Sequence, residues 1–300
     1  MLENNFIKIK EVAKKWGVSE RSVRQYCQAK RVPGAKNEGG IWWLPTDAKK
    51  PSRKGASQKN WTLLDILRLE DRENISGGIY HKIQIELTYN SNHIEGSRLT
   101  HDQTRYIFET NTVGALEKFK GVRADDVVET ANHFRAIDYI IENANRLLSE
   151  NMICKLHFIL KNGTSDSRED WFNVGGYKKL PNEVGGQATT APEEVKLELR
   201  KLLKKYRERK VLDLEDLLDF HYKFEKIHPF QDGNGRIGRL ILFKECLRLN
   251  IVPFIIDDEL KLFYYRGLKE WQKEPGYLRD TCLAAQDKFK KYLEYFKIDF

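Results

Sequence analysis

The sequence predicts a mainly helical chain in which one β-hairpin interrupts a large helical domain and a small helix-turn-helix domain precedes it. Apolar residues recur at steps of three and four over most of positions 61–300, which is the spacing of amphipathic helices. Positions 51–60 are rich in Ser, Lys, Gly and Gln without such a period, as is typical of a linker. The charge is uneven too, because positions 1–60 hold 14 Lys and Arg against 5 Asp and Glu, a net of +9 in a chain of net +8.

The basic N-terminal segment contains two short helical patterns separated by a glycine. The first has its apolar side chains on one face and ends before Gly17, and Ser19 is a suitable N-cap for the second. Helix, tight turn and helix is the outline of a helix-turn-helix. The side chains that the second helix would present to the phosphates and base edges of a DNA major groove are Arg21, Ser22, Arg24 and Gln25.

A loop and a short β wing are predicted after these two helices. Two glycines, Gly39 and Gly40, precede an apolar run from Ile41 to Leu44. The segment as far as residue 51 resembles the winged helix-turn-helix of MerR and excisionase proteins. The resemblance implies that residues 1–55 bind DNA, since a basic face beside a reading helix is the expected electrostatic footprint. The alternative is a small docking domain for a protein partner, whose lysines are only solvated.

Other features favour an intracellular protein without a membrane segment. No apolar run approaches the roughly 20 residues that span a bilayer, and the first ten residues lack a signal-peptide core. The four cysteines are scattered and show no metal-ligand spacing, so reduced, buried thiols are expected. The predicted location is the cytoplasm.

One segment, from His228 to Arg239, combines a histidine, an acid, two glycines and two arginines within twelve residues. An amphipathic helix leads to His228 and is expected to end there, because a residue before proline is disfavoured in the α region. From Ile237 to Phe243 the chain is apolar almost all round, as is typical of a deeply buried helix. The segment is therefore predicted to be a turn that joins two core helices.

The residues of this turn suit the binding of a nucleotide phosphate. A helix N-terminus with glycines at 233 and 235 lets backbone N–H groups approach an anion, and Arg236 and Arg239 lie on one helix face. Asp232 can hold a Mg²⁺ ion that bridges phosphates, and His228 can accept a proton from an attacking hydroxyl. The alternative is structural, because Asp-Gly-Asn-Gly is an ordinary turn and Asp is a common N-cap.

Residues 228–239 meet all eight fixed positions of the pattern His-x-Phe-x-Asp/Glu-Gly-Asn-Gly-Arg-x-x-Arg, and so resemble the Fic family. The resemblance implies that residues 101–300 form a helical domain that moves AMP from ATP to a Ser, Thr or Tyr hydroxyl of a target protein, or of the chain itself. It implies His228 as the base, Asp232 as the Mg²⁺ ligand and Arg236 and Arg239 as contacts of the β- and γ-phosphates. The implied phosphate cradle is Gly233, Asn234 and Gly235, and glycine at 235 favours AMP transfer, because the related Doc kinases have lysine there.

A second motif lies in the segment 56–100, where a linker and helices are predicted. The helix from about residue 79 to 94 ends at Glu95 and Gly96, although an acid there opposes the helix dipole. In the Fic family a Ser/Thr-x-x-x-Glu-Gly/Asn helix is inhibitory, and Ser91, Glu95 and Gly96 match it. The resemblance implies that Glu95 pairs with Arg239 and that Ser91 supports it. The alternative is a surface glutamate.

Two weaker resemblances concern the rest of the domain. The stretch 175–186 is hairpin-like and stands where Fic proteins have a flap that aligns a target segment by strand addition, which implies target contacts at Tyr177, Lys178 and Val184. Tyr264 and Tyr265 resemble a tyrosine pair near the adenine pocket, although a buried aromatic pair is an equal reading. The last helix, near residues 277–295, is expected to pack inward and to offer a face for a homodimer.

Three functions remain open from the sequence. The first is a protein adenylyltransferase under intramolecular inhibition. The second is a de-AMPylating hydrolase at the same site, and the third is a DNA-binding regulator that only senses ATP, against which the intact base His228 argues. One electrostatic question also stays open, because a histidine at a helix C-terminus near phosphates is driven toward its charged form, whereas the arginines and a metal would oppose this.

Overall fold

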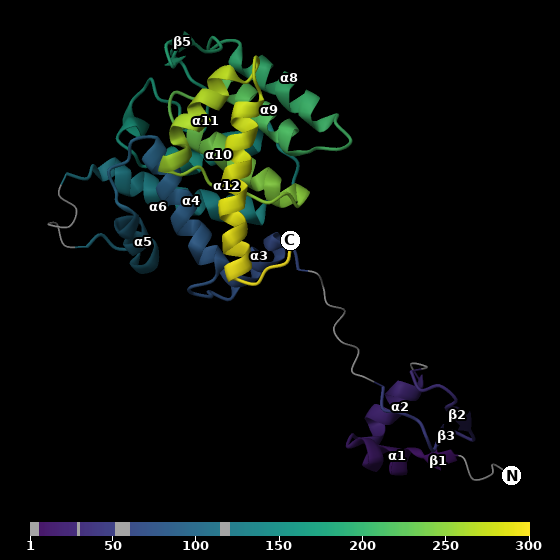
Figure 1. Cartoon of the computed structure of the whole chain (residues 1–300). Coiled ribbons are helices and arrows are strands. Elements are labelled where there is room, and N and C mark those ends of the chain that lie inside the picture. The colour runs from purple at the N-terminus through teal and green to yellow at the C-terminus, as the bar shows by residue number, and fades with distance from the viewer. Residues whose placement is uncertain (1–5, 29–30, 52–60, 115–120) are drawn as a thin grey trace. The chain divides into compact units, whose positions relative to one another are not determined.

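The chain forms two compact units, residues 1–60 and residues 61–300, which are described separately. The structure is a computed structural model that describes residues 6–28, 31–51, 61–114 and 121–300 (Figure 1). The predicted linker at 51–60 and the expected domain boundary at 55 lie outside the described residues except for Pro51. Among the described helices, none has the length and hydropathy needed to cross a bilayer.

The N-terminal unit pairs two helices with a small antiparallel sheet. Its elements are β1 (Phe6–Lys8), α1 (Ile9–Trp16), α2 (Glu20–Gln28), β2 (Lys36–Glu38) and β3 (Ile41–Pro45), and the strand order is β1-β3-β2. Gly17 ends α1 with a φ of 63°, and the Ser22 amide donates to Ser19 Oγ at the start of α2. The helices therefore begin and end where the pattern predicts. Strand β1 was not foreseen, because its pairing with residues 43–45 joins distant segments.

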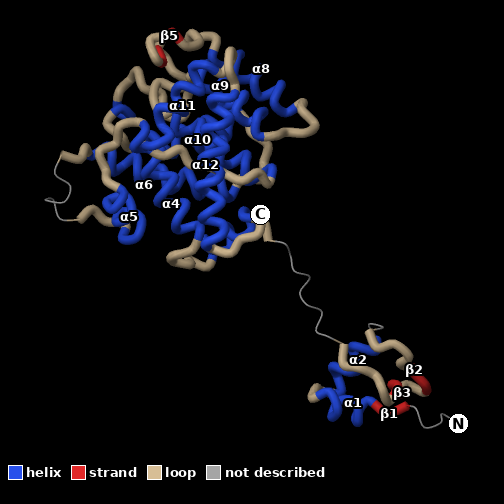
Figure 2. Tube along the Cα trace, in the orientation of Figure 1, coloured by secondary structure: helices blue, strands red, loops and turns tan. Residues whose placement is uncertain are grey.

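The larger unit is helical apart from one hairpin, and Figure 2 shows its helices in blue and its β5 strand in red. Its elements are α3 (Leu63–Arg72), α4 (Ile79–Ile94), α5 (His101–Thr110), α6 (Ala124–Glu142), α7 (Glu150–Lys161), a 3-10 turn (Asp166–Arg168), β4 (Glu183–Val184), β5 (Gln187–Ala188), α8 (Val195–Arg207), α9 (Leu214–Ile227), α10 (Asn234–Leu249), α11 (Asp258–Glu270) and α12 (Gly276–Tyr295). The predicted segments 56–100 and 101–300 share this one compact unit from residue 61 onward.

Helix α10 lies at the centre of the larger unit and contacts α3, α4, α6, α7 and α9 (Figure 1). Its apolar residues Ile237, Leu240 and Phe243 are at most 1% exposed, as the sequence predicts for a helix that is apolar all round. The same helix also buries Arg236 and Arg239. Buried charges need partners, so the neighbouring helices must supply carboxylates or carbonyl groups to α10.

The hairpin differs in position from the predicted stretch 175–186. Its strands lie at 183–184 and 187–188 and are joined by Gly185 and Gly186, which both have positive φ. Such a pair of central residues is typical of a two-residue hairpin turn. Residues 175–182 form turns and loop instead, because Pro181 has no amide proton for strand pairing.

Candidate active site

The loop between α9 and α10 brings the predicted base and the helix N-terminus together. His228 ends α9 in the left-handed region, with a φ of 50°, and Gly233 precedes α10 with a φ of 83°. The buried side chain of Asn234 accepts a hydrogen bond from the Phe230 amide at 2.9 Å and donates to the Phe230 carbonyl at 2.8 Å. These two bonds close the loop and fix its shape, and the N–H groups at the start of α10 are of the kind that suits an anion.

His228 is held in its neutral form. Burial, and after it the positive charge of Lys178, lowers the pKa of its imidazole to about 4. In the chain without nucleotide, desolvation of the charged imidazolium is the largest effect on this pKa. A histidine that is neutral at pH 7 can accept a proton.

Glu225 lies beneath His228, with Oε2 at 3.9 Å from Nδ1 of the histidine. Burial raises the pKa of the Glu225 carboxyl to about 8. Glycine at 238 makes room for this carboxyl, because a Cβ there would lie 2.6 Å from both Glu225 Oε1 and His221 Cε1. The sequence offered no local signal for this group beyond a glycine inside a helix.

Four charged side chains surround the N-terminus of α10 and form a closed ring. Lys161 donates to Glu129 Oε1 at 2.5 Å and to Asp232 Oδ2 at 2.6 Å. Arg236 donates to the same Asp232 oxygen at 3.1 Å and, through Nη1, to Glu129. We refer to Lys161, Glu129, Asp232 and Arg236 as the ionic ring. Sequence reasoning found two of its members and missed Lys161 and Glu129.

The ionic ring keeps Asp232 ionised. Burial acts to raise the pKa of the Asp232 carboxyl, but Arg236 and Lys161 together lower it below its ordinary value. Its side chain is half exposed, so this carboxylate can be reached from solvent. The described residues contain no cluster of three or more His, Cys, Asp or Glu able to enclose a metal. A single accessible carboxylate nevertheless fits Mg²⁺, which takes most of its other ligands from phosphates and water.

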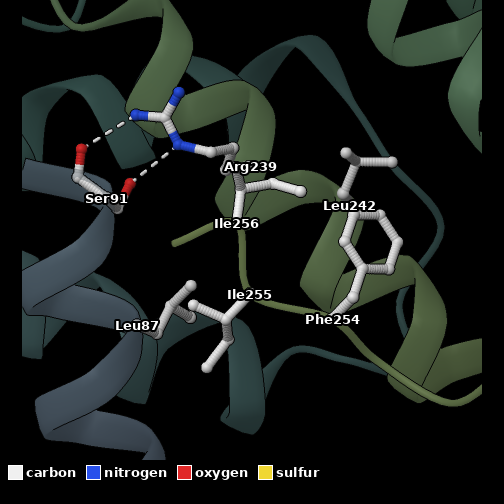
Figure 3. Close-up of a pocket in the computed structure, with 7 residues that line it drawn as sticks. All are labelled: Leu87, Ser91, Arg239, Leu242, Phe254, Ile255 and Ile256. Atoms are coloured by element: carbon white, nitrogen blue, oxygen red, sulfur yellow. Dashed lines mark hydrogen bonds between the residues drawn. The ribbon is translucent and has the colours of Figure 1, made fainter. Parts of the chain in front are cut away.

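Arg239 is joined to the last turn of α4 by three hydrogen bonds. Its Nη2 donates to Glu95 Oε1 at 2.7 Å and to the Ser91 carbonyl at 2.9 Å, and its Nε donates to Ser91 Oγ at 3.1 Å. Figure 3 shows both Ser91 contacts between α4 and α10, beside a small void of about 10 Å³. That void has room for about one water molecule, and apart from Ser91 and Arg239 its lining is apolar.

Gly235 allows Glu95 to reach Arg239. A Cβ at position 235 would lie 2.4 Å from Glu95 Oε1 and 3.0 Å from Arg239 Nη1, so the end of the Glu95 side chain would have to move. The Glu95 carboxylate therefore stands directly over the first turn of α10, in the space where the backbone would meet a phosphate. This gives a steric reason for glycine at this position.

The two predicted adenine contacts have different environments. Tyr264 is 1% exposed, and its hydroxyl lies 2.5 Å from His221 Nε2. The structure thus favours the reading of Tyr264 as a buried aromatic, with no surface left for a base to stack on. Tyr265 is exposed, and its hydroxyl donates to the Ile94 carbonyl at 3.4 Å, next to Glu95.

The predicted flap residues also divide between core and surface. Lys178 is 3% exposed, and its ammonium donates to Asn182 Oδ1 at 2.7 Å and Thr189 Oγ1 at 2.5 Å. Its backbone amide bonds the Pro229 carbonyl, so Lys178 fixes the flap to the active-site loop. Tyr177 packs against Phe230 with ring centroids 6.2 Å apart. Of the three, Val184 is the exposed one.

In the N-terminal unit, the predicted DNA contacts lie on α2. Arg21, Arg24 and Gln25 are exposed, whereas the Ser22 hydroxyl is hydrogen-bonded to Ser19 Oγ at 2.9 Å. Val23 and Cys27, on the opposite side of α2, are buried in the small core. The helix therefore presents two guanidinium groups and an amide to solvent.

Residues 147–245 match the model of the Fic/DOC family. The chain is 28% identical over 189 residues to the protein adenylyltransferase Fic of Drosophila grimshawi, which covers 60% of this chain and 36% of that protein. It is 26% identical over 208 residues to the protein adenylyltransferase fic-1 of Caenorhabditis elegans, covering 67% of this chain and 37% of that protein. The chain thus spans about a third of the length of these curated relatives.

Solved structures agree with this similarity. A Fic domain containing signaling protein from Bacteroides thetaiotaomicron superposes with a TM-score of 0.57 at 26% identity, over 77% of this chain and 90% of that one. Residues 134–508 of Fic-1 from C. elegans superpose with a TM-score of 0.60 at 22% identity, over 78% and 72% of the two chains. Because the sequence identity of the second match is only 22%, this match indicates a shared fold and nothing more.

Proposed function

We propose that this chain, in which residues 147–245 match the Fic/DOC family model, transfers AMP from ATP to a hydroxyl group of a target protein. The observation that carries the proposal is the placement of a neutral His228 on the same short loop as the N-terminus of α10. A base next to a phosphate-binding helix end is the arrangement that hydroxyl attack on a phosphate needs.

His228 would remove the proton from the target hydroxyl as its oxygen bonds to the α-phosphorus. The bond between the α-phosphorus and the bridging oxygen breaks in the same displacement, and pyrophosphate leaves. The amides at the start of α10, beside Gly233 and Gly235, would hold phosphate oxygens that gain charge during this step. Arg236 and Arg239 supply guanidinium groups, which bind phosphate with a fork of donors.

Mg²⁺ fits this site through Asp232, whose carboxylate is ionised and accessible. When bound, the ion would neutralise charge on the phosphates of ATP. The Lys178 backbone amide donates to the Pro229 carbonyl and so holds the predicted flap against the loop. The exposed hairpin edge at Val184 would align a target segment by strand pairing.

The resting chain would be inhibited by Glu95. The Glu95 carboxylate occupies Arg239 and stands over Gly235, so a γ-phosphate cannot reach this arginine in its productive position. Inhibition would be relieved when the end of α4 moves away from α10, because Ser91 and Glu95 are both carried by that end.

The test is incubation of wild type, Glu95→Gly and Glu95→Gly/His228→Ala with α-labelled ATP and Mg²⁺, with label on protein as the readout. We expect label with Glu95→Gly alone. Absence of label on every variant, with the chain itself and a cell extract as acceptors, would contradict the transferase. Release of AMP from a pre-modified protein would then favour the de-AMPylating reaction.

We further propose that the N-terminal unit is a winged helix-turn-helix that binds DNA through α2. The supporting observation is the exposure of Arg21, Arg24 and Gln25 on one helix of a basic unit. In the full chain, Arg21→Ala/Arg24→Ala should weaken binding to a random-sequence duplex pool and lower the salt slope by about 2. The control is Lys10→Ala/Lys14→Ala on exposed positions of α1. Equal losses in both variants would exclude α2 as the reading helix.

A further inference from the structure

Lys161 contacts the carboxylate that would hold the metal. Its Nζ lies 2.6 Å from Asp232 Oδ2 and 2.5 Å from Glu129 Oε1. Lys161 is the last residue of α7 and lies outside the motif at 228–239. The side chain is only 2% exposed, although lysine is rarely buried without a specific partner. A permanent positive charge is therefore part of the proposed metal site.

We propose that the Lys161 ammonium takes the place of a metal ion beside Asp232 and neutralises this carboxylate when no metal is bound. As a result, the affinity of the site for a divalent metal would depend on bound nucleotide. The proposal rests on the proposed function, because it assumes that Asp232 is the metal ligand. Lys161 is thus a positioning residue that acts through Asp232.

The first argument is the charge balance of the ionic ring. Two cations, Lys161 and Arg236, face two carboxylates, Glu129 and Asp232, so the ring is neutral as it stands. A divalent cation on Asp232 would share this carboxylate with the Lys161 ammonium, and two cations on one carboxylate repel each other. Solvent screens the repulsion only in part, because the Lys161 ammonium is buried although Asp232 is half exposed. The triphosphate of ATP brings the negative charge that offsets it.

The second argument is that the Lys161 side chain is fixed in place. Its aliphatic stem lies against Gly233, where an added Cβ would be 3.7 Å from Lys161 Cδ. Its ammonium stands 5.4 Å from the ring centroid of Phe172, within the range of a cation–π contact. The lysine therefore cannot simply swing into solvent when a metal arrives.

The third argument is that Lys161 keeps partners when Asp232 turns to the metal. Glu129 remains bonded to it, and Asp166, a half-exposed carboxylate, lies 3.7 Å from Nζ. A buried ammonium without a partner would be strongly unfavourable. Lys161 avoids this if Asp166 and a phosphate oxygen replace Asp232 as its partners. The ring is thus built to release Asp232 only when a triphosphate enters with the metal.

The test measures metal binding rather than catalysis. Mn²⁺, which replaces Mg²⁺ and has an electron paramagnetic resonance signal, is titrated into the full-length Glu95→Gly chain with and without ATP. The variants added to this background are Lys161→Met, Lys161→Arg and, as a matched control, Lys155→Met, which removes an exposed lysine from the same helix. Asp232→Asn shows whether the bound Mn²⁺ belongs to this site.

We expect Lys161→Met to bind Mn²⁺ at least tenfold more tightly than Lys155→Met in the absence of ATP. ATP should strengthen Mn²⁺ binding in Lys155→Met and Lys161→Arg. The gain in Mn²⁺ affinity caused by ATP should be at least tenfold smaller in Lys161→Met. Equal affinities of Lys161→Met and Lys155→Met without ATP would overturn the inference. If the parent chain binds no Mn²⁺ even with ATP, the metal assignment in the proposed function fails as well, which is a different result.

Lys161→Met could fail to fold, since it leaves one carboxylate without its partner. The double variant Lys161→Met/Glu129→Gln removes one charge of each sign and keeps Arg236 paired with Asp232. It should also bind Mn²⁺ more tightly than Lys155→Met without ATP, because the shared contact on Asp232 is gone. Unchanged affinity in a folded double variant would again overturn the proposal.

Discussion

Arg239 of α10 donates to Glu95 at the end of α4 across 2.7 Å, although the two residues are 144 positions apart in the chain. The bond is made with a guanidinium that is 6% exposed and a carboxylate that is about one-third exposed. A partly exposed carboxylate can leave more readily than a fully buried one, because water replaces its lost partner. The contact is therefore better suited to reversible breaking than to permanent stabilisation of the fold.

Removal of the Glu95 charge should activate the chain in a graded manner. Glu95→Gln retains the shape of the side chain but loses the ion pair, and Glu95→Gly also clears the space above Gly235. We expect AMP transfer to rise in both variants, with Glu95→Gly at least tenfold above wild type and Glu95→Gln between them. Initial rates of label incorporation measure this. Equal rates for wild type and Glu95→Gly, with ATP bound in both, would contradict the inhibitory role.

Ser91→Ala should also raise the rate of AMP transfer, but by less than Glu95→Gly. Its hydroxyl accepts one bond from Arg239 Nε, whereas the Ser91 carbonyl and Glu95 hold Nη2. Ser91→Ala removes only the hydroxyl contact, and such a bond contributes about 1 kcal/mol, or about a fivefold change in an equilibrium. We expect a rise in AMP transfer of that order. A rise as large as that of Glu95→Gly would show that Ser91 holds α4 in place by itself.

The contact between Glu95 and Arg239 also shows what the sequence could predict. The motif from His228 to Arg239 is contiguous, so its loop, its two glycines and its buried helix follow from local pattern. The sequence singles out Glu95 for two reasons: an acid at the C-terminus of a helix opposes the helix dipole, and Ser91, Glu95 and Gly96 resemble a known motif. Lys161 and Glu129 have no such signal, because their neighbours are 32 to 107 residues away and only the tertiary fold brings them together.

The burial of Lys178 is a second case that local pattern could not predict. A lysine in a Gly-Tyr-Lys-Lys stretch is expected to be solvated, and its neighbour Lys179 does reach the surface. Lys178 turns inward because its ammonium donates hydrogen bonds to Asn182, Thr189 and the Ile227 carbonyl. The first two acceptors lie on either side of the hairpin strands and the third lies at the end of α9, so these acceptors come together only after folding.

The pH dependence of AMP transfer should reflect the lowered pKa of His228. The neutral base is present above its pKa of about 4 and is lost as the pH falls through that value. Glu225, whose pKa is raised to about 8, stays protonated up to about pH 7. We therefore expect kcat/KM of Glu95→Gly to be nearly constant from pH 6 to 7 and to fall toward pH 4. An acid limb centred near 6.5, the ordinary value for histidine, would contradict this assignment.

Gly238 should be intolerant of alanine, although alanine normally stabilises a helix interior by about 1 kcal/mol relative to glycine. A Cβ at this position would lie 2.6 Å from Glu225 Oε1 and from His221 Cε1, both of which are buried against α10. Overpacking of this kind costs about 1–3 kcal/mol. Gly238→Ala should therefore lower the free energy of unfolding, where alanine would ordinarily raise it. Displacement of Glu225 should also disturb His228, which it approaches at 3.9 Å.

Gly276→Ala provides the control for this substitution, because Gly276 is also helical and its added Cβ would meet only the end of the Glu274 side chain. Urea unfolding followed by circular dichroism should show a loss of stability for Gly238→Ala and little change for Gly276→Ala. In the Glu95→Gly background, Gly238→Ala should lower kcat more than it raises KM for ATP, since the base is disturbed and the phosphate contacts of α10 are kept. Equal stability of the two alanine variants would mean that His221 and Glu225 yield easily, and the support of His228 by this cluster would then be wrong.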